Sequence, residues 1–264
     1  MKRIFVNLKR FDVPKALGGI CTSDDPVKWI QRIMEGSKAL TRAKVCYLLP
    51  EALILSAMAK KPSNIEIGSQ TVYKADITPG GNFGAFTSQL PAAAVKNYGC
   101  TWAMIGHSEE RRDRGNAEFN AEMRCADGQG LSILYCVGEK AEEQPRKYEV
   151  IAEQLVVGLE GIKGEVVIGY EPMWAIGPGK TPPPADYIED IAAFIKRTVL
   201  EACGYAPEVV YGGGLKEANA AEVASCASVD GGLVALTRFT GDIGFYPDEL
   251  ERIIDRYVEG GAAE

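Results

Sequence analysis

The single histidine of the chain is the first residue whose type suits acid–base chemistry. His107 follows an apolar, strand-like run and a glycine, and it precedes a Ser108–Glu109 pair at which we expect a short helix to begin. Histidine is the one side chain whose unperturbed pKa lies within the physiological range, so any histidine acid–base chemistry must use this residue. A surface histidine in a loop is the competing interpretation, which only the rest of the chain can decide.

A glutamate before a proline is the second residue that suits such chemistry. Pro172 biases Glu171 towards an extended conformation, which would end a strand with the carboxylate pointing outward. The segment that follows, up to Thr181, has proline and glycine at both ends of an apolar middle, which is the composition of a lid that closes as a unit. Taken alone, Glu171 would more simply be a solvated residue at a strand end.

Eight short apolar runs predict the β-strands that would position these residues. Several runs are rich in β-branched residues and apolar on both faces, as parallel strands covered by helices are. The runs lie near Ile4–Leu8, Val45–Leu49, Ile65–Ser69, Trp102–Gly106, Ser132–Val137, Val166–Tyr170, Val209–Tyr211 and Gly231–Ala235. Between them, helical spacing predicts a helix that is capped by Asp24-Asp25-Pro26 and runs to Met34, and further helices over Glu153–Leu159, Tyr187–Leu200 and Pro247–Val258.

This alternation predicts an α/β fold, a single (β/α)8 barrel. Eight β-then-α units fit a chain of 264 residues, and no linker divides it, so we expect residues 1–264 to form one domain. A doubly wound sheet is the alternative, but no G-x-G-x-x-G motif follows an early strand. Barrel enzymes build their active sites at the C-terminal ends of the strands. The most distinctive residues all lie at such ends: Asn7, Lys9, His107, Glu171 and Gly212–Gly214.

Composition and charge narrow the possible functions. A hydrophobic content of 46% and a charged content of 25% are typical of soluble globular proteins. No apolar run could span a bilayer, and the N-terminus reaches polar residues before a signal-peptide core could form, so we expect a cytoplasmic protein with no membrane partner. The net charge of −7 argues against a nucleic-acid partner. Seven cysteines without a C-x-x-C pair, beside one histidine, predict reduced thiols and no metal site.

Several motifs give the chain a resemblance to a known family. They are Asn7-x-Lys9, Gly84-Ala85-Phe86-Thr87, Gly106-His107-Ser108-Glu109, Cys136-Val137-Gly138-Glu139, Glu171-Pro172-x-Trp174-Ala175-Ile176-Gly177-x-Gly179-Lys180-Thr181 and Tyr211-Gly212-Gly213. In this order along the chain, they resemble the motifs of triosephosphate isomerases. The resemblance implies a TIM barrel that interconverts D-glyceraldehyde 3-phosphate and dihydroxyacetone phosphate with no metal or organic cofactor.

The resemblance also implies roles for individual residues. Glu171 would move a proton between neighbouring carbons through an enediolate, and neutral His107 would polarise the carbonyl and move protons between the two oxygens. Lys9 would supply positive charge to the developing oxyanion, held by Asn7 and paired with Glu109. Two further positions that match the motifs are expected to support the site, namely Tyr211 and Cys136.

The phosphate-binding side departs from the family pattern. The resemblance implies that phosphate is bound by backbone amides at Gly177, Gly214, Ala235 and Leu236. Gly214 replaces a serine of the family, and Ala235 and Leu236 replace two glycines, so their side chains would limit close approach. Arg238 could supply charge to the phosphate instead, although a solvated surface arginine is the alternative.

Two hydrogen bonds that hold the closed lid in the family are expected to be missing. At the matching lid position Pro182 has no N–H to offer Tyr211, and Gly214 has no hydroxyl. At about 1 kcal/mol each, their loss would shift a lid equilibrium several-fold.

The resemblance further implies a homodimer that forms through the loops after the first and third strands. Thr87 matches a loop that reaches into the partner's active site in the family. The segments Val13–Pro26 and Lys74–Phe83 look longer than in the family, and Glu110 replaces an arginine beside His107.

Two other functions compete with a triose phosphate isomerase. The first keeps the Glu/His/Lys machinery but isomerises a tetrulose phosphate, such as L-erythrulose 1-phosphate and D-erythrulose 4-phosphate, or another short sugar phosphate. It is motivated by the altered phosphate side. The second is a barrel that has lost catalysis, which the presence of Asn7, Lys9, His107 and Glu171 disfavours.

Overall fold

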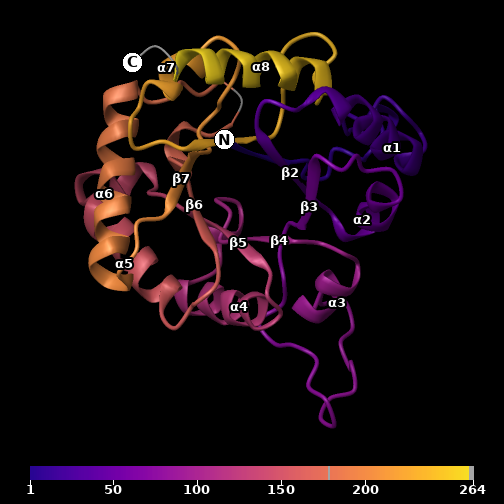
Figure 1. The fold of residues 1–264 in the computed structure, drawn as a ribbon, viewed down its shortest axis with the longest axis horizontal. Coiled ribbons are helices and arrows are strands. Elements are labelled where there is room, and N and C mark those ends of the chain that lie inside the picture. Colours follow the sequence, from indigo (N-terminus) through magenta and orange to yellow (C-terminus); the bar gives the residue numbers. More distant parts are fainter. Residues whose placement is uncertain (178, 262–264) are drawn as a thin grey trace.

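The computed structural model describes residues 1–177 and 179–261, and its centre is a closed barrel of eight parallel strands. The strands follow one another around the barrel in chain order, and β1 closes the ring by pairing with β8 (Figure 1). Their bounds are β1 Arg3–Asn7, β2 Lys44–Leu49, β3 Ile65–Ser69, β4 Trp102–Ile105, β5 Ser132–Val137, β6 Val166–Tyr170, β7 Glu208–Tyr211 and β8 Gly231–Val234. Each corresponds to one of the eight apolar runs.

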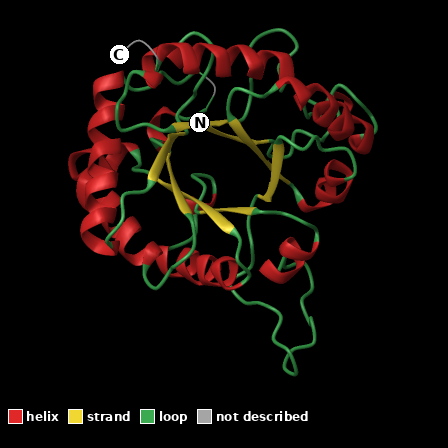
Figure 2. Cartoon of the chain, viewed as in Figure 1, coloured by secondary structure: helices red, strands yellow, loops and turns green. Residues whose placement is uncertain are grey.

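Helices surround the barrel on the outside, as Figure 2 shows. They are α1 Pro26–Gly36, α2 Glu51–Met58, α3 Ala92–Asn97, α4 Asn116–Gly128, α5 Lys147–Leu159, α6 Ala185–Cys203, α7 Ala220–Ala224 and α8 Pro247–Gly260. Short 3-10 turns lie at Lys15–Leu17, Ser37–Ala39, Glu110–Arg112, Ala141–Arg146 and Met173–Ala175. The prediction of a (β/α)8 TIM barrel is therefore confirmed, and a doubly wound sheet is excluded because the sheet is closed.

The core has two layers, which explains why the strands are apolar on both faces. Side chains that point into the barrel, including Phe5, Trp102 and Leu134, form one buried cluster. Side chains that point outward, such as Tyr47 and Ile168, form a second cluster with the helices. A strand that must be buried on both sides needs a nearly continuous apolar run.

Helix boundaries differ most from the sequence-based expectation in two places. The helix expected from Glu153 begins at Lys147, directly after a 3-10 turn. The helix expected at Ser108 is a single 3-10 turn over Glu110–Arg112, in which the Glu110 and Arg111 amides donate to the His107 carbonyl oxygen. The Ser108 and Glu109 amides, which have no acceptor within such a turn, donate to the side chains of Glu171 and His107. Elsewhere the capping prediction holds, since Asp25 accepts a hydrogen bond from the Lys28 amide at the start of α1.

One segment projects beyond the ring of helices. It joins β3 to α3 and extends away from the barrel at the bottom of Figure 1. Its exposed residues include Phe83, which is 85% exposed, and Thr87. Within the described ranges, no helix is both long and apolar enough to cross a membrane.

Candidate functional site

His107 and Glu171 lie against each other at the C-terminal end of the barrel. His107 follows β4 and Glu171 follows β6, and the Nε2 atom of His107 is 3.2 Å from Oε1 of Glu171. Only 6% of His107 and 3% of Glu171 is exposed. Two groups that can exchange protons thus meet where water is largely excluded.

Glu171 is held in position by hydrogen bonds from Ser108 and by close packing against two glycines. Its Oε2 accepts a hydrogen bond from the Ser108 amide at 2.8 Å, and its Oε1 faces the Ser108 hydroxyl at 3.3 Å. A Cβ atom at Gly138 would lie 1.8 Å from the Glu171 carbonyl oxygen, and one at Gly212 would lie 2.9 Å from Glu171 Cγ. Only glycine fits at Gly138, so this residue allows the close approach that places Glu171.

A backbone amide after His107 determines which nitrogen of the neutral imidazole ring carries the hydrogen. The Glu109 amide donates to Nδ1 of His107 at 3.3 Å, so Nδ1 acts as an acceptor. In a neutral ring with Nδ1 accepting, the hydrogen is on Nε2. Nε2 is the atom that faces Glu171, so the ring presents an N–H donor to the interior of the site.

Lys9 is held by a strained backbone and an ion pair. Its φ of 40° lies in the left-handed region, which is uncommon for a residue with a side chain and is typical of functional sites. Its Nζ lies 2.7 Å from Oε1 of Glu109. Burial alone would raise the pKa of Glu109, but the hydrogen bond and the charge of Lys9 outweigh burial and lower it. The pairing of Lys9 with Glu109 implied by the resemblance is therefore present.

Asn7 fixes the turn that carries Lys9. Its Oδ1 accepts hydrogen bonds from the Lys9 amide and from Nε2 of Gln70, each at 3.0 Å. Gln70, directly after β3, also contacts the Lys9 carbonyl oxygen at 3.2 Å. The sequence analysis missed Gln70, because nothing in its local pattern distinguishes it from a surface glutamine. The two side chains come together because β1 and β3 pair with opposite edges of β2.

Cys136 lies inside the barrel beneath Glu171. Its thiol is fully buried, and burial together with the charge of Glu171 raises its pKa well above the usual value. The thiol is therefore protonated and unreactive at neutral pH. The backbone carbonyl of Cys136 accepts hydrogen bonds from the Arg111 guanidinium at 2.6 and 3.0 Å, which ties β5 to the segment after His107.

The segment expected to form a lid is attached at its first turn and exposed at its tip. The indole Nε1 of Trp174 donates to Oε1 of Glu139 at 2.6 Å. Gly177, Gly179 and Lys180 are exposed, and Gly177 has a φ of 121°. Pro178, also part of the expected lid, lies outside the described residues.

The turn after β7 is closed on itself. The Tyr211 hydroxyl donates to the Gly213 carbonyl oxygen at 2.7 Å, and Gly214 has a φ of 97°. A Cβ atom at Gly214 would lie 3.7 Å from Cγ of Pro182, so the turn and the lid's second half are neighbours. In the conformation described, no hydrogen bond joins Tyr211 to the described part of the lid.

The segment between β8 and α8 forms a small hairpin. Ala235 and Leu236 follow β8 and are half-buried, and Arg238 pairs with Gly244 across the hairpin. The Arg238 guanidinium binds Oε1 of Glu249 at 2.6 Å and stacks on the Tyr246 ring. The Arg238 guanidinium is therefore engaged by Glu249 and Tyr246 in the conformation described, which disfavours the hypothesis that it binds the phosphate.

Comparisons with known proteins agree on one family. The family model described as triosephosphate isomerase matches residues 22–242. A triosephosphate isomerase from Deinococcus radiodurans is 38% identical over 195 residues, which cover 71% of this chain and 77% of the relative. Another, from Nitratidesulfovibrio vulgaris, is 33% identical over 223 residues, covering 78% and 83%. A third, from Ruegeria, is 35% identical over 196 residues, covering 71% and 77%.

The chain belongs to the triosephosphate isomerase family. The resemblance drawn from the motifs is thereby confirmed. The motif residues His107, Glu171, Lys9 and Asn7 come together at the barrel mouth, as family membership leads one to expect. The phosphate-side positions Gly177, Gly214, Ala235 and Leu236 lie on the lid and on the segments after β7 and β8.

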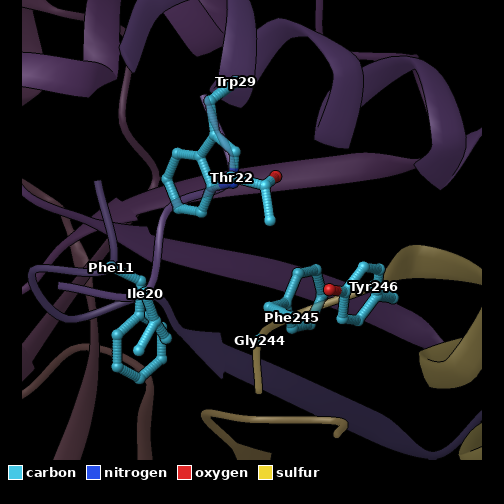
Figure 3. A pocket seen from close by; sticks show the side chains of 7 residues that line it. All are labelled: Phe11, Ile20, Thr22, Trp29, Gly244, Phe245 and Tyr246. Atoms are coloured by element: carbon cyan, nitrogen blue, oxygen red, sulfur yellow. The ribbon is translucent and has the colours of Figure 1, made fainter. Parts of the chain in front are cut away.

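Two cavities lie away from the contact between His107 and Glu171. The first, of about 20 Å³, is between the segment after β1 and the segment before α8, and Figure 3 shows the side chains around it. It is lined by Phe11, Ile20, Thr22, Trp29, Gly244, Phe245 and Tyr246. It has room for about one water molecule and is too small for a sugar phosphate. The second, of about 530 Å³, opens between the segments after β2, β3 and β4.

Proposed function

We propose that the protein interconverts D-glyceraldehyde 3-phosphate and dihydroxyacetone phosphate. The observation that carries the proposal is the contact of 3.2 Å between the buried His107 and Glu171 side chains, in a chain whose relatives are named triosephosphate isomerases. The alternative, an isomerase of a tetrulose phosphate, is not favoured because all three of these relatives carry the triose name.

Glu171 acts as the base in the proposed reaction. Its carboxylate removes a proton from the carbon next to the substrate carbonyl, and the electron pair of that C–H bond forms an enediolate. The protonated Glu171 then returns a proton to the neighbouring carbon, which converts ketose to aldose with no net gain or loss of atoms. A carboxylate with 3% exposure suits this role, since little water surrounds it to be displaced by the substrate.

His107 acts as the electrophile. With Nδ1 accepting from the Glu109 amide, the Nε2–H faces Glu171 in the conformation described, and it can donate to the carbonyl oxygen once Glu171 has moved. The same nitrogen can pass its hydrogen to one enediolate oxygen and take the hydrogen of the other. A fixed ring orientation serves this exchange, because both oxygens must lie within hydrogen-bond reach of one atom.

Lys9 supplies positive charge beside the same oxygens. The Asn7 side chain fixes its backbone turn, and Glu109 fixes its ammonium group at 2.7 Å. A cation placed in advance stabilises the developing oxyanion without reorganisation during the reaction. Its strained φ of 40° supports the view that position, and not only charge, matters here.

The conformation described corresponds to a resting state of this site. Glu171 is bound by the Ser108 amide and hydroxyl, so its carboxylate must leave Ser108 to reach a substrate carbon. Because Glu171 continues directly into the lid, movement of the lid towards the mouth would carry Glu171 with it. Amides of Gly177, Gly214, Ala235 and Leu236 would then bind the phosphate, in place of the Arg238 guanidinium.

We further propose that the protein is a cytoplasmic homodimer. The segment between β3 and α3 projects with Phe83 and Thr87 exposed, and the 530 Å³ groove at its base could receive the same segment of a second copy. Two carboxylate oxygens that are buried near that groove, Oε2 of Glu110 and Oε2 of Glu122, have no partner among the described residues. The Thr87 and Ser88 hydroxyls of a second copy could supply the missing donors. The seven cysteines are all free, as expected in a reducing compartment.

Two measurements test these proposals. A coupled assay should supply triose phosphates and tetrulose phosphates side by side to the wild type and to Glu171→Gln. We expect strong triose turnover by the wild type alone, and faster tetrulose than triose turnover would overturn the substrate assignment. Sedimentation velocity should give a species of twice the 28.5 kDa chain mass, whereas a 28.5 kDa species at micromolar concentration would overturn the dimer.

A further inference from the structure

The turn after β7 is held by two side chains, each of which bonds a carbonyl oxygen beside the α-carbon of Gly214. The Tyr211 hydroxyl donates to the Gly213 carbonyl oxygen at 2.7 Å. Further along the chain, Nδ2 of Asn219 donates to the Gly214 carbonyl oxygen at 3.2 Å. The peptide group before the Gly214 α-carbon and the one after it are therefore both hydrogen-bonded to side chains.

Asn219 also bonds the end of the same turn. Its Oδ1 accepts from the Lys216 amide at 2.8 Å, and its own amide donates to the Lys216 carbonyl oxygen at 3.1 Å. Between these points Leu215 is 1% exposed and packs on β8, where the absence of a side chain at Gly232 leaves room for it. The three bonds of Asn219 therefore span the turn from Gly214 to Lys216.

The side chain of Asn219 serves this turn and not the helix that follows. Asn219 directly precedes α7, a position at which asparagine commonly accepts a hydrogen bond from an amide in the first turn of the helix. Within the described structure its side chain makes no such bond, and both of its hydrogen bonds go back to the turn. Loss of this side chain should therefore disturb the turn more than α7.

The direction of the Gly214 amide follows from the bond before it. In a trans peptide the N–H points away from the carbonyl oxygen, so the Gly214 N–H points away from the Tyr211 hydroxyl that holds the Gly213 oxygen. Among the described residues this N–H has no acceptor. An amide with a fixed direction and no acceptor is suited to bind an anion without reorganisation.

We propose that Asn219 is a positioning residue for phosphate binding, which holds Gly214 in the conformation that presents its amide to the substrate phosphate. The inference rests on the proposed function, because only a phosphorylated substrate would use this amide. Glycine samples a wide range of backbone conformations, so its φ of 97° has to be fixed by bonds on both sides. Tyr211 supplies the bond on one side and Asn219 supplies the bond on the other.

Asn219→Ala removes both side-chain bonds. We expect KM for dihydroxyacetone phosphate and the competitive inhibition constant of inorganic phosphate to rise about five-fold each, with kcat changed less than about twofold. Asn219→Ser should give the same rise, because serine is favoured before a helix but its hydroxyl lies one atom short of the position of Nδ2.

The matched control is Asn64→Ala. The Asn64 side chain is also half-buried and donates to backbone carbonyl oxygens, those of Ser37 and Leu40, but it precedes β3 at the end of the barrel opposite the site. Its loss should change neither KM nor the phosphate inhibition constant. An unchanged KM in both Asn219→Ala and Asn219→Ser would overturn the inference.

A substrate without phosphate separates positioning from a general structural role. Isomerisation of D-glyceraldehyde, followed by nuclear magnetic resonance, would use His107 and Glu171 but has no phosphate to bind. Asn219→Ala should leave kcat/KM for D-glyceraldehyde unchanged while kcat/KM for dihydroxyacetone phosphate falls about five-fold. Equal losses with the two substrates would overturn the inference. If D-glyceraldehyde turnover is too slow to follow, kcat with the phosphorylated substrate decides, because a general structural change would lower kcat as well.

The outcomes also distinguish this inference from the proposed function. Wild-type turnover of triose phosphates with no response to the two Asn219 variants would leave the proposed function standing and overturn the role of Asn219. A wild type that turns over no triose phosphate would overturn both.

Discussion

The two sides of the barrel mouth are organised differently. On the side of β1, β4 and β6, side chains bond directly to one another, as in the His107–Glu171 and Lys9–Glu109 contacts. On the side of β7 and β8, polar groups bond within their own segments, as in the Tyr211 hydroxyl on Gly213 and Arg238 on Glu249. We propose that the first side, the chemical side, acts on the substrate carbonyl, and that the second, the phosphate side, offers backbone amides to the phosphate.

This difference predicts different kinetic signatures. Changes on the chemical side should lower kcat, because they remove groups that act on the transition state. Changes on the phosphate side should mainly raise KM, because the phosphate is bound in both ground and transition states. Substitutions on the two sides should therefore differ in the kinetic constant that they change.

Glu171→Gln should have the largest effect. It retains the shape of the side chain but removes the base, so we expect kcat to fall about a thousandfold with KM changed less than about threefold. Steady-state kinetics in both directions measures this. A fall in kcat of less than tenfold would contradict the role of Glu171.

His107→Gln should follow, with kcat reduced about a hundredfold. The amide can still donate one hydrogen bond to the carbonyl oxygen, but it cannot pass a proton between two oxygens. Steady-state kinetics would measure the loss of kcat, and circular dichroism would confirm that the variant is folded. An equally large rise in KM with kcat retained would place His107 among binding groups instead.

Gly214→Ala should act on the other side of the mouth. The φ of 97° is unfavourable for alanine, so the turn after β7 should shift and KM should rise about five-fold with kcat nearly unchanged. Gly204→Ala is the matched control, because Gly204 has a φ of 81° at the end of α6, with open space around it and no part in the site. A similar KM for both variants would remove Gly214 from the phosphate site.

Arg238→Ala should have the smallest kinetic effect. Its guanidinium is engaged by Glu249 and the Tyr246 ring, so we expect KM to stay within twofold while Tm falls slightly. A KM that rises more than five-fold would show that Arg238 exchanges Glu249 for the phosphate during turnover.

The sequence predicts the chemical side better than the phosphate side, for a physical reason. The chemistry requires particular side-chain types, so His107, Glu171, Lys9 and Asn7 can be recognised by their identity and their place after strands. In the proposed site the phosphate would be bound by amides, which nearly every residue has, so Ala235 and Leu236 could be placed only by resemblance. The sequence left open whether Arg238 binds the phosphate or lies on the surface, because its partner Glu249 comes from α8.

The eight strands were predictable because burial on both faces demands long apolar runs, whereas partners from distant segments were not. Gln70 meets Asn7 because β1 and β3 both flank β2, and Tyr187 in α6 meets Glu139 after β5. Helix lengths were also less predictable. The helix expected at Ser108 is only a short 3-10 turn that ends at Arg112, and the local sequence pattern did not indicate this end.

Solvent exchange during turnover tests the proton transfer at Glu171 most directly. Dihydroxyacetone phosphate should be converted in D2O, and the aldose product should be analysed by nuclear magnetic resonance for deuterium at the carbon that was the carbonyl of the ketose. A proton held on Glu171 between the two transfers can exchange with solvent, so we expect deuterium at that carbon and loss of conversion in Glu171→Gln. Product that forms without deuterium, at a rate that Glu171→Gln leaves unchanged, would contradict the proposed mechanism.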